Sequence, residues 1–113
     1  MIVYRYENEN ERGPYASCGV LDMFMEHNAA ASEPGTCQPA ARVDFNTTRI
    51  PLWARFGCPS IQALNTWFRG WEIDLEKAGY HVAIYEVADD DVQIGASGLQ
   101  CLFDCRHAVR LEF

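Results

Sequence analysis

The hydrophobic pattern is strongest between residues 60 and 87, SIQALNTWFRGWEIDLEKAGYHVAIYEV in one-letter code. Large apolar side chains recur there at the three- and four-residue spacing that places them on one face of a helix. They are Ile61, Leu64, Trp67, Phe68, Trp71, Leu75 and Ala78. Ser60 is a suitable N-cap because its hydroxyl can accept a hydrogen bond from a free amide, and Gly79 is a suitable C-terminal stop. The pattern predicts one long amphipathic helix from Ser60 to Ala78.

Runs of aromatic and β-branched residues predict the strands. Residues 80–87 have apolar side chains at both odd and even positions, which favours a strand covered on both faces. Residues 1–6, 99–103 and 109–113 alternate, and residues 92–94 form a shorter apolar piece. We therefore predict an α+β fold with a mostly antiparallel sheet of four or five strands and the long helix packed on one face.

The remaining stretches complete this prediction. An apolar run after Ser17 predicts a second helix of about ten residues. Residues 42–56 stay unassigned, because Pro51 prevents a continuous central strand there. With 113 residues, of which 49% are hydrophobic, the chain has enough apolar side chain for one core, so residues 1–113 are predicted to form a single domain.

Charge narrows the functional classes. The formal net charge is -7, so a nucleic-acid backbone would be repelled, and we expect no direct nucleic-acid binding. No segment approaches the roughly 18 consecutive apolar residues of a membrane span, and the first residues do not resemble an export signal. The sequence predicts a cytoplasmic protein with no membrane segment.

The chain has five cysteines: Cys18, Cys37, Cys58, Cys101 and Cys105. Their odd number and the expected reducing compartment favour free thiols that act as small hydrophobic side chains. Cys101, Cys105 and His107 could together supply three metal ligands. Zinc sites usually contain C-x-x-C pairs, which are absent here, so we expect no metal.

Familiar catalytic motifs are absent. The chain contains no P-loop, G-x-G-x-x-G, H-E-x-x-H or G-x-S-x-G sequence. The three histidines, His27, His81 and His107, lie on different predicted elements, and their spacing pairs none of them with a nucleophile. We expect them to be structural or surface residues, and we predict no catalytic residue from motifs.

One arrangement nevertheless resembles the ADP-ribosyltransferase-like domains. The opening VYRY, the downstream Gly13-Pro14-Tyr15 and Ser17, and the closing GLQCLFDCRHAVRLEF are similar to that family's first and last strands. The resemblance implies an NAD site in which Arg5 holds the dinucleotide, Tyr15 stacks on it and Ser17 lies near the nicotinamide ribose.

The catalytic position of that resemblance differs. Gln100 stands where the family carries its glutamate, and Gln100 cannot supply the negative charge that stabilises a developing cation. Glu86 is the nearest substitute on a strand. The resemblance therefore implies an NAD-dependent enzyme or an inactive descendant. In the alternative reading, Arg5 is an edge-strand arginine and Gln100 faces solvent.

Acidic residues support a different hypothesis. They cluster at three places: Glu7, Glu9 and Glu11; Glu72, Asp74 and Glu76; and Asp89, Asp90 and Asp91. If two of these clusters share one face, they would form a negative patch that fits a protein groove meant for phosphates. Ile73 lies opposite the buried helix stripe, among acids, and is a candidate contact. Alternatively, the acids only keep the domain soluble.

In size and acidity the chain resembles small phage and mobile-element proteins such as anti-CRISPR proteins, which usually act by binding. We therefore predict first a non-enzymatic binding protein without cofactor. Its expected partner is a protein, such as a host complex that handles nucleic acid. The alternatives are the NAD-dependent enzyme and a structural or assembly protein.

Overall fold

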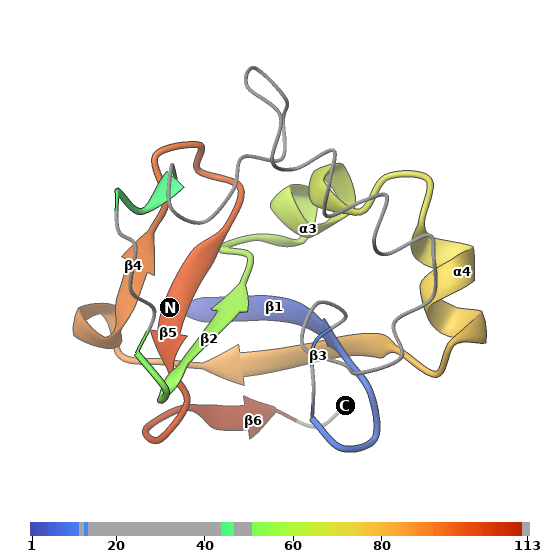
Figure 1. The fold of residues 1–113 in the computed structure, drawn as a ribbon. Coiled ribbons are helices and arrows are strands. Elements are labelled where there is room, and N and C mark those ends of the chain that lie inside the picture. Colours follow the sequence, from blue (N-terminus) through green and yellow to red (C-terminus); the bar gives the residue numbers. More distant parts are fainter. Residues whose placement is uncertain (12, 14–43, 47–50, 112–113) are drawn as a thin grey trace.

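The computed structural model describes residues 1–11, 13, 44–46 and 51–111, and these residues form two antiparallel sheets and two short helices (Figure 1). The first sheet has the order β1-β3-β6, and the second has the order β2-β5-β4. The strands are β1 (Ile2–Glu7), β2 (Ala54–Gly57), β3 (His81–Glu86), β4 (Val92–Ile94), β5 (Cys101–Asp104) and β6 (Val109–Leu111). An isolated bridge between Tyr4 and Cys58 joins the two sheets, with nitrogen–oxygen distances of 2.9 and 2.7 Å in its two hydrogen bonds.

The predicted long helix is wrong, and so is the predicted single sheet with that helix on one face. The segment forms α3 (Ile61–Trp67) and α4 (Glu72–Lys77) instead. Between them Gly70 has a φ of +87°, a left-handed conformation that cannot continue a helix. The Trp71 amide closes the turn on the Phe68 carbonyl at 2.9 Å. The amphipathic stripe is real, but a glycine divides it.

The two predicted helix signals at the ends of this segment are confirmed. The Ser60 hydroxyl accepts a hydrogen bond from the Ala63 amide at 3.0 Å, which caps α3. Gly79 has a φ of +90° directly after α4. The helix predicted after Ser17 lies outside the described residues.

The strand predictions are largely confirmed. The predicted strands at residues 1–6, 80–87, 99–103 and 109–113 correspond to β1, β3, β5 and β6, and residues 92–94 form β4. The acidic turn at Asp89–Asp91 is a 3₁₀ helix, η1. Strand β2 was not predicted, because it lies in the segment left unassigned around Pro51.

The β1-β3-β6 sheet has two chemically different faces. Residues directly opposite each other on antiparallel strands point to the same side, so the strand register defines both faces. The inner face carries Val3, Arg5, Glu7, His81, Ala83, Tyr85 and Arg110. The outer face carries Ile2, Tyr4, Tyr6, Val82, Ile84, Glu86, Val109 and Leu111.

The two faces of this sheet pack into two different hydrophobic cores. On the inner face Val3 packs with Val87, Cys101 and Phe103, so this core lies between the two sheets. On the outer face Tyr4 and Tyr6 pack against the helix residues Leu64, Trp67, Phe68 and Leu75. The Tyr6 and Phe68 rings meet edge to face at 5.0 Å. The helices therefore cover the β1 side of the outer face.

Candidate functional site

A hollow of about 200 Å³ lies on the β2-β5-β4 sheet. Leu102 and Asp104 of β5 form its floor, with Trp53 and Ala54 on one side and Asp91 and Gln93 on the other. By register this is the face opposite to Phe103, which packs into the core between the sheets. The hollow is thus a concave surface with an acidic residue in its floor.

Hydrogen bonds from Arg106 hold Asp104 in the floor of this hollow. Its side chain is buried, and Arg106 donates from Nε to Oδ1 at 3.0 Å and from Nη2 to Oδ2 at 2.8 Å. The Arg106 amide also donates to Oδ1 at 2.9 Å. The Arg106 guanidinium lies 4.9 Å from the ring centroid of Trp53. Hydrogen bonds from Arg106 lower the pKa of Asp104 to about 2, so this carboxylate is charged at neutral pH.

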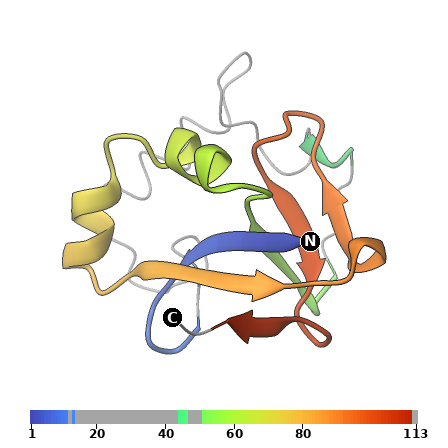
Figure 2. The same cartoon turned by 180° about the vertical axis from the view of Figure 1, so that it is seen from behind.

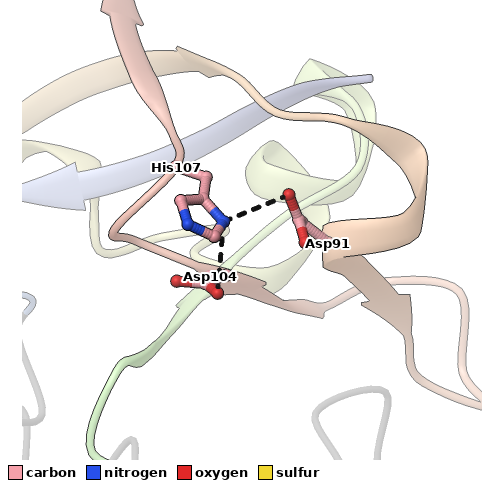
Figure 3. Close-up of side chains that lie close together, drawn as sticks. All are labelled: Asp91, Asp104 and His107. Carbon is pink, nitrogen blue, oxygen red and sulfur yellow. Dashed lines mark ion pairs between the residues drawn. The ribbon is translucent and has the colours of Figure 1, made fainter.

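His107 completes a cluster with two carboxylates (Figure 3). Its Nδ1 lies 3.6 Å from Asp104 Oδ2 and 3.7 Å from Asp91 Oδ2. Asp91 ends η1, Asp104 ends β5, and His107 lies in the turn before β6. Among the described residues, this is the group with the side-chain chemistry and spacing to hold a metal ion.

This cluster differs from the metal ligands considered from sequence. Cys101 is fully buried in the core between the sheets, and His107 faces carboxylates instead. In the sequence, the signal for this cluster was the pair Asp104 and His107, which lie three residues apart at the end of a strand. Asp91 could be added only once β4 was known to pair with β5.

Arg5, the predicted NAD ligand, lies on the inner face and is only 6% exposed. Its Nε lies 3.3 Å from Oε2 of Glu7, which is fully buried. Burial lowers the pKa of Arg5, and the charge of Glu7 opposes that shift. The prediction that Glu7 is an exposed partner contact is therefore wrong, because its carboxylate forms an internal ion pair.

Two further side chains hold Glu7. The Tyr85 hydroxyl donates to both carboxylate oxygens, at 3.0 and 2.9 Å. Arg110 Nη2 lies 3.4 Å from Oε1. Burial and the hydrogen bond to Glu7 raise the pKa of Tyr85 to about 12. We call Arg5, Glu7, Tyr85 and Arg110 the Glu7 cluster.

The other predicted NAD residues do not join Arg5. Glu86 is exposed on the outer face, and Arg5 lies on the inner face of the same sheet. Gln100 is buried, so the alternative that it faces solvent is also wrong. Tyr15 and Ser17 lie outside the described residues. The described members of this predicted site therefore do not meet in one cavity.

The acidic clusters separate into two groups. Glu72, Asp74 and Glu76 lie on α4, beside the end of β1, and burial and the charges of Glu72 and Glu76 raise the pKa of Tyr6. Glu9 and Glu11 follow β1, and Glu11 lies 3.6 Å from Arg110. At the other end of β1, Asp89 lies 3.0 Å from the N-terminal amine, before Asp90 and Asp91.

The length of β1 separates these groups by about 20 Å, at roughly 3.3 Å for each residue. Figures 1 and 2 agree, because α4 and β4 lie on opposite sides of the molecule in both views. The acids of η1 are therefore not part of one patch with the others, whereas Glu9, Glu11 and the acids of α4 lie towards the same end of β1.

The outer face of the β1-β3-β6 sheet has an exposed apolar part. Val82 is 39% exposed and Val109 is 60% exposed, and Ile2 at the end of β1 is 36% exposed. Ile84 and Leu111 lie between them and are half-buried. We call these five residues the outer strip. Ile73 on α4 is 68% exposed and forms a separate apolar point.

Comparison with known proteins identifies the class as a bacteriophage-type protein. The chain matches the family described as Bacteriophage T4 Y00F protein over residues 1–113, and it belongs to that family. The expected phage origin is thereby supported, whereas the match gives no support to the anti-CRISPR or ADP-ribosyltransferase resemblance. No curated protein and no solved structure matches the chain. Within the described residues, no helix has the length and apolar character needed to span a membrane.

Proposed function

We propose that this phage protein acts by binding a protein partner through the outer strip. The observation that carries the proposal is a group of exposed and half-exposed apolar side chains on three adjacent strands, Ile2 on β1, Val82 and Ile84 on β3, and Val109 and Leu111 on β6. Several exposed apolar side chains gathered on adjacent strands are typical of interaction sites, whereas single exposed apolar residues are ordinary.

Charge favours a partner with a basic surface. Glu86 is exposed on the outer face between Ile2 and Val109, and Asp89 follows just beyond the end of β3. With a net charge of -7, the protein would attract a basic surface from a distance and repel an acidic one. The apolar strip would then supply the close contact.

The narrower form of this proposal is inhibition. A host complex that handles nucleic acid has a basic surface, and a phage protein bound there would block it in the host cytoplasm. Membership in a phage family and the acidic charge support this form of the proposal. It needs neither turnover nor a cofactor.

The first experiment identifies and tests the partner. Proteins captured from a phage host with the tagged chain are identified by mass spectrometry, purified and titrated calorimetrically. We expect the double variant Val82→Glu/Val109→Glu to bind about 100-fold more weakly, the size of a central interface substitution. Both side chains point outward, so the thermal melt of the free variant should match that of the wild type.

Ile73→Glu is the matched control, because it makes the same chemical change at an exposed apolar residue of α4. Its affinity should stay within about threefold of wild type. Unchanged binding by the double variant would refute the proposal, and loss with Ile73→Glu alone would place the contact on α4. Sedimentation of the free protein tests the assembly alternative: self-association abolished by the double variant would make the strip a contact between copies of this chain.

A further inference from the structure

We propose that Asp91, Asp104 and His107 bind one divalent transition-metal ion. The site lies at the β2-β5-β4 sheet and uses none of the residues of the outer strip. It is therefore independent of the proposed partner binding, and either proposal can fail without the other.

The spacing of the three side chains suits a shared ion better than direct contact. His107 Nδ1 is 3.6 Å from Asp104 Oδ2 and 3.7 Å from Asp91 Oδ2. Both distances exceed the roughly 2.7–3.2 Å of a nitrogen–oxygen hydrogen bond. Two ligands that each lie about 2.1 Å from one ion, at tetrahedral or slightly wider angles, are separated by about 3.4–3.6 Å. The ligand atoms of all three side chains lie within 4.8 Å of one another, and both carboxylates face the His107 ring in Figure 3, so rotation of the side chains would let them share one ion.

The donor set selects the class of ion. Two carboxylate oxygens neutralise a divalent charge, and the imidazole nitrogen favours transition ions over Mg²⁺ and Ca²⁺, which prefer oxygen ligands. Mn²⁺, Fe²⁺ and Zn²⁺ all accept this combination of ligands.

Arg106 has the position of an orienting residue for this site. It donates to both oxygens of Asp104, and its guanidinium also rests on Trp53, which fixes the direction of the carboxylate. Asp104 Oδ2 accepts one hydrogen bond from Arg106 Nη2, and a carboxylate oxygen has a second lone pair for an ion. The positive guanidinium also opposes the charge of the ion, so we expect binding of moderate strength.

The hollow on the β2-β5-β4 sheet borders this cluster. Asp91 and Asp104 both line it, so an ion held by them would border open space on the β2-β5-β4 sheet. With three protein ligands, the remaining coordination positions would face that space and could take water or a small anionic ligand. Three ligands with an open position distinguish reactive metal sites from closed structural ones.

Manganese is the best probe because thiolates bind this hard ion poorly, and the cysteines of the chain would compete for zinc. The full-length protein is titrated with Mn²⁺, and free ion is measured from its electron paramagnetic resonance signal. We expect saturation at about one Mn²⁺ for each chain. His107→Ala and Asp91→Asn should each weaken binding at least about tenfold, because loss of a residue that only orients a ligand already costs about 10–100-fold.

Two controls separate a site from general acidity. His81→Ala removes an exposed histidine of β3, and Asp90→Asn removes the carboxylate next to Asp91; both should leave Mn²⁺ affinity unchanged. In nuclear magnetic resonance spectra at low Mn²⁺ occupancy, bound Mn²⁺ should broaden the ring signals of His107 much more strongly than those of His81. Asp104 is left intact, because it is buried and its loss could unfold the chain. Absence of saturable binding, or equal losses in Asp90→Asn and Asp91→Asn, would overturn the proposal.

Discussion

Glu7→Gln is the substitution that tests the Glu7 cluster most directly. Glutamine keeps the size of the side chain and an oxygen that can accept the Tyr85 hydrogen bond, but it removes the charge. The Glu7 side chain is fully buried, and Arg5 beside it is 6% exposed. The variant would therefore leave the Arg5 guanidinium inside the protein without its 3.3 Å ion-pair partner.

The expected loss follows from that uncompensated charge. Breaking a buried ion pair by removing one partner costs about 3–5 kcal/mol. Arg110 also approaches Glu7, at 3.4 Å, but it is partly exposed and can turn to solvent, so it adds little to the loss. For a domain of this size each kcal/mol shifts the melting temperature by about 4 °C, so we expect a decrease of about 12–20 °C.

Circular dichroism melts and urea unfolding provide the measurement. Glu9→Gln is the matched control, because it makes the same change at an exposed residue two positions along the chain. Adding Arg5→Met to Glu7→Gln removes the stranded charge and should recover at least half of the lost stability. A melting temperature of Glu7→Gln within about 2 °C of Glu9→Gln would show that Arg5 is not left as an uncompensated buried charge.

Two further predictions concern acid stability and the helix break. Arg106 lowers the pKa of Asp104 to about 2, so this contact stabilises the fold above the unfolded-state pKa near 4 and loses its effect as pH falls towards 2. Arg106→Gln should therefore lower the melting temperature at neutral pH, and the difference from wild type should shrink on acidification; melts that stay parallel at every pH would contradict this. Gly70 has a φ of +87° with open space around it, so Gly70→Ala should cost about 1 kcal/mol through backbone strain alone, whereas Gly70→Asn should cost less, because asparagine tolerates this conformation. Equal urea stability of Gly70→Ala and wild type would contradict the second prediction.

The helix break shows where the hydrophobic pattern is informative and where it is not. The three- and four-residue spacing correctly identified the apolar side chains that meet the sheet, including Leu64, Trp67 and Leu75. It contains no information about continuity, because two short helices with a turn between them can present the same stripe. Gly70 was the local signal for a break. A glycine in a helical pattern is tolerated often enough that the pattern outweighed it.

The predictions for Arg5 and Glu7 depended on whether their side chains point to solvent or to the interior. The periodicity of β1 does not decide between the two. Alternation puts Arg5 and Glu7 on one face, but both faces of β1 are covered, one by the other sheet and one by the helices. A charged residue on such a strand is buried whichever way it points. The Asp91–His107 contact depends in turn on the pairing of β4 with β5, a long-range choice that no local motif specifies.

The distribution of charge over the β1-β3-β6 sheet connects the fold with the proposed function. The inner face buries the charged Arg5 and Glu7, whereas the outer face exposes the apolar Val82 and Val109. In this part of the sheet, charged side chains are therefore inside and apolar side chains outside, the reverse of the usual arrangement. Burying an ion pair contributes little net stability compared with apolar packing. Moving Val82 and Val109 inward would require register shifts in both β3 and β6, because each one-residue slip turns every side chain of a strand to the other face. The outer strip thus stays on the surface, on the face opposite the buried ion pair, which is the arrangement that the proposed partner binding requires.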